Sequence, residues 1–232
     1  MTTILTNLQD VRRRIEAACA AAQRQPAEIT LLAVSKTFGC DAVREAASAG
    51  QRAFGENYIQ EGLEKISELQ DLGLEWHCIG PIQSNKTRLV AASFDWAHTV
   101  DRLKTAQRLS EQRPPERGPL NVCLQVNIDG GPTKAGVAPQ DALALAREVA
   151  ALPGLRLRGI MTLPEPAPDF AAQKAVHLRA SALFRRLQDA GLPLDTLSMG
   201  MTADLEAAIA AGATLVRVGT AIFGGRSRPA GA

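Results

Sequence analysis

Residues 29–37 read Ile-Thr-Leu-Leu-Ala-Val-Ser-Lys-Thr, and this stretch decides the fold. Six apolar or β-branched residues that end in a turn predict a buried strand, which carries Lys36 to its C-terminal end. Partial burial lowers the pKa of a lysine and favours the neutral amine, which can attack a carbonyl carbon and form a Schiff base. The alternative is a lysine whose stem packs on the strand end while its ammonium stays in water. This stretch alone leaves both interpretations open.

The same pattern, a short apolar run followed by an amphipathic segment, recurs along the chain. Further strands are predicted at residues 52–54, 76–79, 95–100, 120–126, 155–163, 195–199 and 214–218. Helices are predicted between them, two of them at residues 84–92 and 139–152, and a last short one begins near Ala221. An additional amphipathic helix that starts at Ile4 precedes the first strand.

Eight repeats of strand and helix in 232 residues predict a closed parallel (β/α)8 barrel of the TIM type, with an extra N-terminal helix. An open doubly wound sheet is the alternative. The chain has neither a GxGxxG motif after its first strand nor a Walker-type phosphate loop, which counts against the nucleotide-binding form of that sheet. No shift in composition and no long linker divides the chain, so residues 1–232 are predicted to form a single domain.

Composition narrows the function classes. The 26 basic and 24 acidic residues leave a net charge of +2, and the basic residues are spread along the chain, which argues against a nucleic-acid partner. The four cysteines form no CxxC pair, which favours reduced thiols. Neither a signal-peptide pattern nor an apolar run of membrane-spanning length is present. We expect a cytoplasmic, monomeric protein without a membrane partner.

A barrel of this type places its functional side chains at the C-terminal ends of the strands. Lys36 ends the first strand, Asn57 follows the second, and Arg217 lies on the eighth, pointing inward. The loops after strands seven and eight commonly hold a phosphate in this fold, and here they supply small residues and hydroxyls at Gly200, Thr202, Gly219 and Thr220. Met199, at the end of strand seven, is also predicted to contact the ligand. A reactive lysine opposite a phosphate site suggests an aldehyde that carries a phosphate, and pyridoxal 5′-phosphate fits, with Arg217 facing its ring.

Several motifs are family-specific. They are AVSKTF at 33–38, GENYIQEG at 55–62, WHCIGPIQSNK at 76–86, DRLKTAQRL at 101–109, NVCLQVNI at 121–128, GIMTLPEP at 159–166, SMGMTADLEAAI at 198–209 and RVGTAIFGGR at 217–226. With them the chain resembles the pyridoxal phosphate homeostasis protein (YggS/PROSC) family, whose barrel is similar to the N-terminal barrel of alanine racemase. The resemblance extends from about Leu5 to Arg226.

The resemblance implies roles for individual residues. Lys36 corresponds to the imine-forming lysine and Arg217 to the arginine at the pyridine nitrogen. Thr202, Gly219 and Thr220 correspond to phosphate-binding positions, and Asn57 to a position near the ring. The family usually has serine where Thr202 stands, and threonine keeps the hydroxyl.

Two functions compete for this cofactor site. The first is a carrier that buffers pyridoxal phosphate or supplies it to apo enzymes, and the second is an amino-acid racemase. An arginine at the pyridine nitrogen opposes protonation of the ring and weakens it as an electron sink, which favours the carrier. Racemisation also needs a second acid/base, a tyrosine supplied by an additional domain in alanine racemase, and Tyr58 is the single tyrosine here. A Schiff-base aldolase would share the lysine but would not explain Arg217.

The remaining polar residues have ordinary interpretations. His77 and His98 lie within predicted strands and are expected to be hydrogen-bonded core groups, whereas His177 is expected on the surface of a helix. Glu56 and Tyr58 flank Asn57 without a predicted role. No spacing of His, Cys and carboxylates predicts a metal site.

Overall fold

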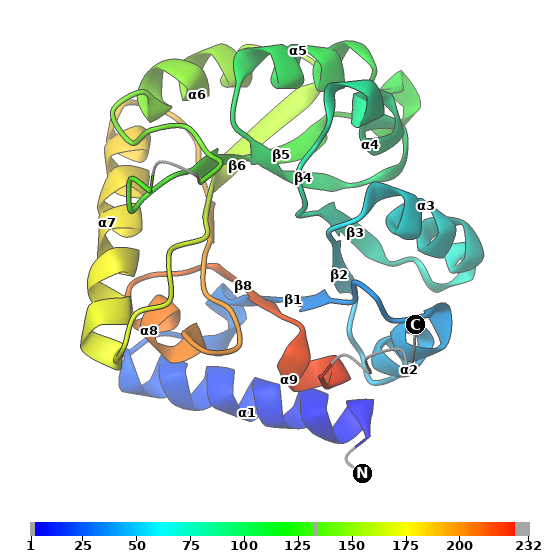
Figure 1. Cartoon of the computed structure of the whole chain (residues 1–232), viewed down its shortest axis with the longest axis vertical. Helices are drawn as coiled ribbons and strands as arrows, with labels where there is room; N and C mark the ends of the chain where they lie inside the picture. The colour runs from blue at the N-terminus through cyan, green and yellow to red at the C-terminus, as the bar shows by residue number, and fades with distance from the viewer. Residues whose placement is uncertain (1–2, 132–133, 226–232) are drawn as a thin grey trace, which may run out of the picture.

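A computed structural model describes residues 3–131 and 134–225 of the chain, so Arg226, the last residue of the RVGTAIFGGR motif, lies outside the described residues. Its strands form one closed barrel in the order β1 to β8, as Figure 1 shows. The strands are β1 Thr30–Val34, β2 Ala53–Glu56, β3 Glu75–Cys78, β4 Trp96–Val100, β5 Leu120–Val126, β6 Leu155–Thr162, β7 Thr196–Ser198 and β8 Leu215–Val218. The predicted parallel (β/α)8 barrel is therefore confirmed.

Closure is made by parallel pairing of the first and last strands, with Thr30 opposite Leu215 and Ala33 opposite Val218. The α-helices surround the barrel as an outer ring (Figure 1). They are α1 Ile4–Ala21, α2 Cys40–Ser48, α3 Ile59–Glu68, α4 Thr87–Ser93, α5 Leu103–Glu111, α6 Ala142–Ala150, α7 Phe170–Asp189, α8 Leu205–Ala210 and α9 Thr220–Phe223.

The extra N-terminal helix is also confirmed. Helix α1 buries Leu8, Val11, Ile15, Ala18 and Cys19, and it packs against α2, α8 and α9. Its apolar positions recur at intervals of three or four residues, so one face is buried while its arginines stay on the other. The helix covers the place where the ends of the barrel sheet meet.

Some predicted boundaries were wrong. The helix expected at 139–152 runs only from Ala142 to Ala150, because residues 138–141 form a turn in which the Asp141 amide donates to the Ala138 carbonyl. The helix expected from Ser84 begins with a single 3-10 turn, and its α-helical part starts at Thr87. The second strand continues to Glu56 instead of ending at Phe54.

The apolar core lies between the barrel and its helices. Successive residues on a strand face opposite sides of the sheet, so each strand sends one set of side chains to the helices and the other into the barrel. Phe54, Ala97 and Val122 belong to the large outer core. The barrel interior holds two small apolar clusters, one around Leu32 and one around Trp96, and several buried polar side chains.

Among the described residues, no helix has both the length and the apolar character needed to cross a membrane.

Candidate functional site

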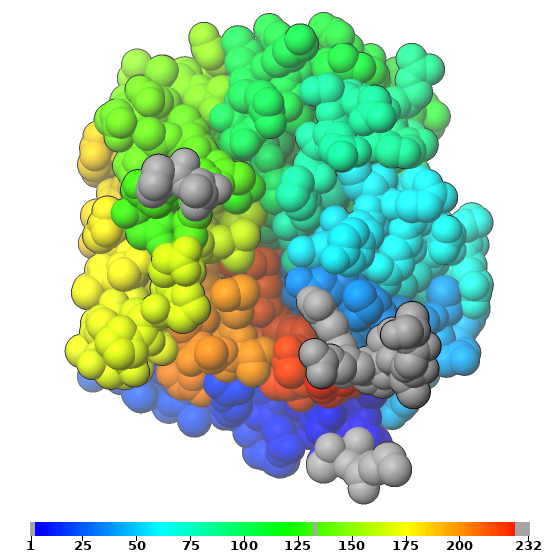
Figure 2. All heavy atoms as spheres, viewed as in Figure 1, coloured from blue at the N-terminus to red at the C-terminus, as the bar shows by residue number. Residues whose placement is uncertain are grey.

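A cavity of about 310 Å³ lies at the C-terminal ends of the strands. Of the eight residues predicted for the site, six line it: Lys36, Asn57, Thr202, Arg217, Gly219 and Thr220. In the space-filling view the red residues of β8 and α9 lie recessed between the yellow, green and blue segments (Figure 2). The structure thus brings together residues that are up to 184 positions apart, Lys36 and Thr220, around one space.

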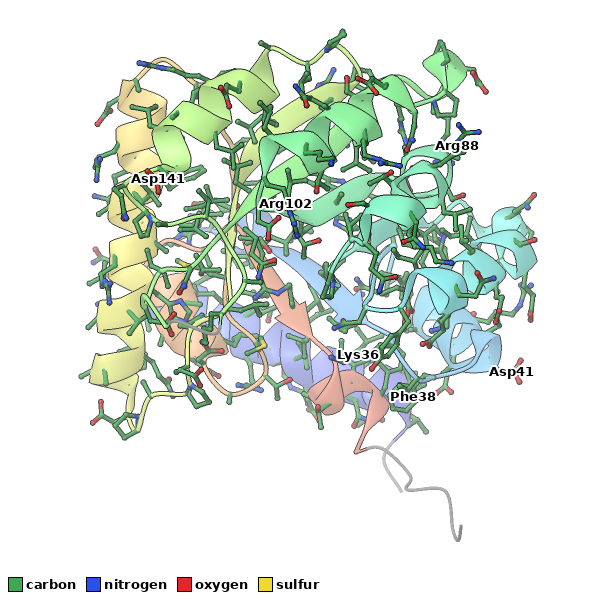
Figure 3. All side chains as sticks on the ribbon, turned by 45° about the horizontal axis from the view of Figure 1, so that its top comes forward. Lys36, Phe38, Asp41, Arg88, Arg102 and Asp141 are labelled. Carbon is green, nitrogen blue, oxygen red and sulfur yellow. The ribbon has the colours of Figure 1, made fainter. Side chains whose placement is uncertain are left out.

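Lys36 is half-buried at the end of β1. It lies beside α9 together with Phe38, whose ring stacks on Phe223 at 5.2 Å, while Asp41 and Asp141 lie at the periphery (Figure 3). The next residue, Thr37, has φ +69°, a left-handed conformation that a β-branched residue rarely adopts. Its amide donates to Glu61 Oε1 at 2.6 Å, which helps to hold this conformation.

A buried ion cluster holds Ser35, the residue that precedes Lys36. Lys65 Nζ donates to the Ser35 carbonyl at 2.8 Å and to Glu56 Oε1 and Glu61 Oε1 at 2.7 Å each. Ser35 Oγ donates to Glu56 Oε1 at 2.5 Å. We call Ser35, Glu56, Glu61 and Lys65 the Lys65 cluster. Burial raises the pKa of Glu56 above its ordinary value of 4.5, although the ammonium of Lys65 and the hydroxyl of Ser35 oppose this shift.

The Lys65 cluster was not predicted from the sequence, in which Glu56 had no expected role. A signal was present. Lys65 lies on the buried side of α3, next to Ile66 and in line with Gly62 and Leu69, and Glu61 precedes it by four residues. A lysine on the buried face of a helix needs a buried partner, and Glu56 at the end of the neighbouring strand supplies one.

Arg217 forms the floor of the cavity with a side chain that is almost fully buried. Its Nη1 donates to Ser198 Oγ at 2.8 Å and its Nη2 to the Thr162 carbonyl at 2.8 Å. Burial lowers the pKa of Arg217 to about 10, which leaves the guanidinium protonated at neutral pH. The predicted inward direction of this side chain is therefore confirmed.

The loops after β7 and β8 bring Thr202, Gly219 and Thr220 to the cavity. A Cβ on Gly219 would lie 3.1 Å from the Val34 carbonyl, so glycine lets β8 pass close to β1 at this point. Arg14 on α1 donates to the Thr202 carbonyl at 2.8 Å and pairs with Glu206 at 2.8 Å. These contacts fix the Thr202 loop from outside the cavity.

Two of the predicted site residues lie behind the cavity and not in its lining. Met199 is fully buried, and its amide donates to the Leu215 carbonyl. Gly200 has φ +89°, and a Cβ there would lie 2.4 Å from the Ala208 Cβ. Both residues therefore shape the turn that carries Thr202. The sequence pattern could not distinguish this structural role from a place in the cavity lining.

His177 was expected on the surface, and this expectation was wrong. It is 1% exposed, and its Nε2 contacts Asp204 Oδ2 at 2.9 Å. Asp204 in turn accepts the Met201 amide at 2.6 Å, so His177 supports the loop that carries Thr202. His77 and His98 are fully buried and hydrogen-bonded, as predicted.

Asn57 supplies a further polar group to the cavity lining, in addition to Thr37. Its Oδ1 is buried and has no hydrogen-bond partner among the described residues, so this acceptor is left unsatisfied beside the cavity. Gly80 is essential to its position, because a Cβ at Gly80 would lie 1.9 Å from the Asn57 carbonyl oxygen. No group of three His, Cys, Asp or Glu side chains suited to a metal ion occurs in the described part of the chain.

Comparison with known proteins places these features in a family. Residues 6–227 match the family model "Alanine racemase, N-terminal domain". The chain is 60% identical over 226 residues to the pyridoxal phosphate homeostasis protein of Pseudomonas aeruginosa, with 97% of each chain covered. It is 53% identical over 229 residues to the protein of the same name from Escherichia coli K12, with 97% of this chain and 98% of the relative covered.

Solved structures of other proteins have the same fold. PipY of Synechococcus elongatus, solved with PLP bound, has a TM-score of 0.80 and 39% identity, and the match covers 90% of this chain and all of PipY. Alanine racemase of Clostridium difficile shares the fold, with a TM-score of 0.68 and 17% identity over 95% of this chain but 58% of the racemase. The chain therefore belongs to the pyridoxal phosphate homeostasis protein family, whose barrel has the fold of the alanine racemase N-terminal domain.

Proposed function

We propose that the protein binds pyridoxal 5′-phosphate in the cavity, with Lys36 as the Schiff-base lysine, and that it buffers the cofactor or supplies it to apo enzymes. The observation that carries this proposal is the lining of the cavity. Lys36 and Arg217 are its ionisable side chains, and hydroxyls and glycines occupy the loops between them. The binding of PLP by PipY supports the choice of ligand.

The residues fit the parts of this cofactor. When bound, pyridoxal phosphate supplies an aldehyde that an amine can capture and a ring that can withdraw electrons. The half-buried amine of Lys36 would hold the aldehyde carbon. Thr202, Gly219 and Thr220 would bind the phosphate through hydroxyls and close backbone, and Arg217 would lie at the pyridine nitrogen. The unpartnered Oδ1 of Asn57 would accept a hydrogen bond from the ligand.

Two features favour storage over racemisation. A protonated Arg217 beside the pyridine nitrogen opposes its protonation and so weakens the ring as an electron sink. The described residues that line the cavity include no Asp, Glu, His, Cys or Tyr that could act as a second acid/base opposite Lys36. Tyr58 is 57% exposed and does not line the cavity.

We also propose that the protein is a monomer in which each chain carries its own cofactor cavity. Cys19, Cys40, Cys78 and Cys123 are free thiols, which suits the reducing cytoplasm that we propose as the location.

The decisive experiment reduces the loaded protein with borohydride and maps the modified peptide. We expect the label on Lys36 and none in Lys36→Ala, whereas Lys104→Ala, which changes an exposed lysine of α5, should keep it. Loaded wild-type protein should restore activity to an apo pyridoxal-phosphate enzyme. Trapping on a different lysine of the wild-type protein would refute the role of Lys36.

The phosphate contacts can be tested separately. Thr220→Val removes a hydroxyl donor to a charged acceptor, which should weaken pyridoxal phosphate binding by roughly tenfold to a hundredfold. Pyridoxal without its phosphate should bind the variant and the wild-type protein equally. Equal losses for both ligands would place the phosphate elsewhere.

The racemase alternative has its own assay. With L-alanine in deuterated water, the loaded protein should exchange no α-proton beyond the rate of free cofactor. Saturable exchange that disappears in Lys36→Ala would instead identify a racemase.

A further inference from the structure

A line of hydrogen-bonded side chains crosses the barrel interior from one mouth to the other. Glu75 Oε1 contacts His77 Nε2 at 2.8 Å, and His77 Nδ1 contacts His98 Nε2 at 2.9 Å. His98 Nδ1 contacts Ser198 Oγ at 3.1 Å, and Ser198 Oγ accepts from Arg217 Nη1 at 2.8 Å. We call Glu75, His77, His98 and Ser198 the interior chain.

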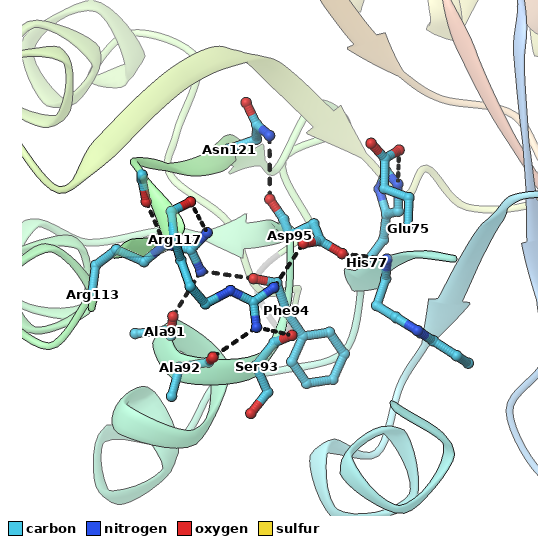
Figure 4. A network of polar contacts seen from close by, with 12 residues as sticks. Glu75, His77, Ala91, Ala92, Ser93, Phe94, Asp95, Arg113, Arg117 and Asn121 are labelled. Atoms are coloured by element: carbon cyan, nitrogen blue, oxygen red, sulfur yellow. Dashed lines mark hydrogen bonds and ion pairs between the residues drawn. The ribbon is translucent and has the colours of Figure 1, made fainter. Parts of the chain in front are cut away.

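The interior chain connects two different cavities, because Glu75 lines one and Arg217, the partner of Ser198, lines the other. The side chain of Glu75 is 49% exposed at the N-terminal ends of the strands, where it and His77 line a cavity of about 230 Å³. Figure 4 shows the contact between Glu75 and His77, close to the polar groups around Asp95. Arg217, at the other end, lines the cavity proposed for the cofactor. His77, His98 and Ser198 are fully buried between these ends.

The chemistry of the ends fixes the direction of every bond. An arginine can only donate and an ionised carboxylate can only accept. Because Ser198 Oγ accepts from Arg217, its own proton is free to bond to His98 Nδ1. His98 then donates from Nε2 to His77 Nδ1, and His77 donates from Nε2 to Glu75. Each imidazole thus carries one proton, on Nε2, and every donor and acceptor along the chain is satisfied.

The electrostatic surroundings agree with this arrangement. Burial lowers the pKa of both His77 and His98, which keeps the imidazoles neutral, and the hydrogen bond from His77 lowers the pKa of Glu75, which keeps it ionised. Asp95 faces His77, Arg158 faces Glu75, and Cys123 and Asp204 face Arg217. Arg158 is itself paired with Asp195 at 2.8 Å.

We propose that the interior chain, in which every hydrogen bond has a fixed direction, positions Arg217. It fixes the guanidinium at the floor of the cofactor cavity and connects it to the carboxylate of Glu75 at the opposite mouth. The proposal rests on the proposed function only for the statement that Arg217 faces the cofactor ring. Without the Glu75 carboxylate, the proton of His77 can move to the other ring nitrogen. The hydrogen bonds of His98 and Ser198 then lose their fixed direction. Arg217 then loses a partner of fixed orientation.

The direct test is ¹⁵N NMR of the ligand-free protein with labelled histidine. The chain has three histidines, so a His177→Gln variant leaves only the signals of His77 and His98. At a pH of about 6.5, where an ordinary histidine is half protonated, both should be neutral with the proton on Nε2. A proton on Nδ1 of either ring, or a charged ring at this pH, would overturn the proposal.

The second test changes the far end. Glu75→Leu should alter the ¹⁵N pattern of both rings, shift the absorbance maximum of the bound cofactor and its pH profile, and weaken binding by about threefold to tenfold. Glu75→Gln keeps an acceptor oxygen and should restore all three properties. Glu148→Leu, at an exposed position on α6, is the matched control.

The two proposals fail in different ways. If the wild-type protein binds no pyridoxal phosphate, the proposed function is wrong while the NMR result on the ligand-free protein still decides the interior chain. If Glu75→Leu and Glu148→Leu give the same spectra and the same affinity, Glu75 does not position Arg217.

Discussion

The Lys65 cluster and the interior chain are two buried polar assemblies that differ in how their charges are arranged. In the first the opposite charges are in direct contact, and in the second neutral groups separate them. The Lys65 cluster lies between the sheet and α3 and opposes an ammonium to two carboxylates within 2.7 Å. The interior chain lies inside the barrel and connects a cation to a carboxylate through two neutral imidazoles and a hydroxyl. The first holds the residues on both sides of Lys36, and the second holds Arg217. The comparison predicts that removing one charge from the Lys65 cluster lowers the free energy of unfolding more than removing one group from the interior chain does.

The largest effect is expected for Lys65→Met. This change leaves the carboxylate of Glu56 buried without its ammonium, which should lower the free energy of unfolding by about 3–5 kcal/mol in urea denaturation. The double variant Lys65→Met with Glu56→Leu should recover most of the loss, because no charge is then left unpaired. A loss below about 1 kcal/mol for the single variant would show that the cluster is not a tightly coupled ion pair.

A smaller effect is expected for Ser198→Ala in the interior chain. Arg217 loses one acceptor and His98 one donor, but no charge loses its only partner, because Arg217 Nη2 keeps the Thr162 carbonyl. The free energy of unfolding should fall by about 1–3 kcal/mol. Ser48→Ala, at an exposed position of α2, is the control and should leave stability nearly unchanged. A loss as large as that of Lys65→Met would remove the distinction between the two assemblies.

The two assemblies should also respond to pH with opposite signs. The pKa of Glu56 is raised above 4.5, so the folded state holds this proton more tightly than the unfolded chain, and the contribution of Glu56 to stability falls as the pH rises above 4.5. The pKa of Glu75 is lowered, so its contribution is present above pH 4.5 and is lost as the pH falls below it.

Glu56→Gln and Glu75→Gln separate these contributions. Measured against the wild-type protein from below to above pH 4.5, the stability of Glu56→Gln should improve as the pH rises, and that of Glu75→Gln should decline. The same direction for both variants would contradict the assignment of one of the two carboxylates.

The smallest effect is expected at the surface. Arg44 and Asp71 form an ion pair at 2.9 Å, but their side chains are 41% and 60% exposed. Arg44→Ala should therefore lower the free energy of unfolding only slightly, and the difference should shrink in high salt. A loss comparable to that of Lys65→Met would mean that burial does not separate the two pairs.

The sequence predicted the barrel and the cluster of site residues because both follow from alternation. Eight strand-and-helix repeats leave few closed arrangements, and a barrel necessarily gathers the ends of its strands at one mouth. Helix ends were harder to place, as residues 138–141 show, because a local turn there replaces the first turn of the expected helix.

Contacts between distant side chains could not be predicted in the same way. The contact between His77 and His98 depends on the register of β3 and β4, in which His77 lies opposite Trp96 and His98 lies two residues further on. The burial of His177 could have been predicted, because Ala180, Phe184 and Leu187 lie on its face of α7. Its Asp204 partner is in another loop, and only the folded chain brings them together.

The left-handed backbone at Thr37 sets the stability of the fold against the order of the neighbouring Lys36 side chain. A β-branched residue at φ +69° costs about 1–3 kcal/mol. Glycine at this position would relieve that strain, and the more flexible unfolded chain would offset part of the gain. The same change would widen the range of positions open to the neighbouring Lys36 amine. Thr37→Gly should therefore relax the backbone and at the same time loosen the Lys36 side chain that lines the cavity.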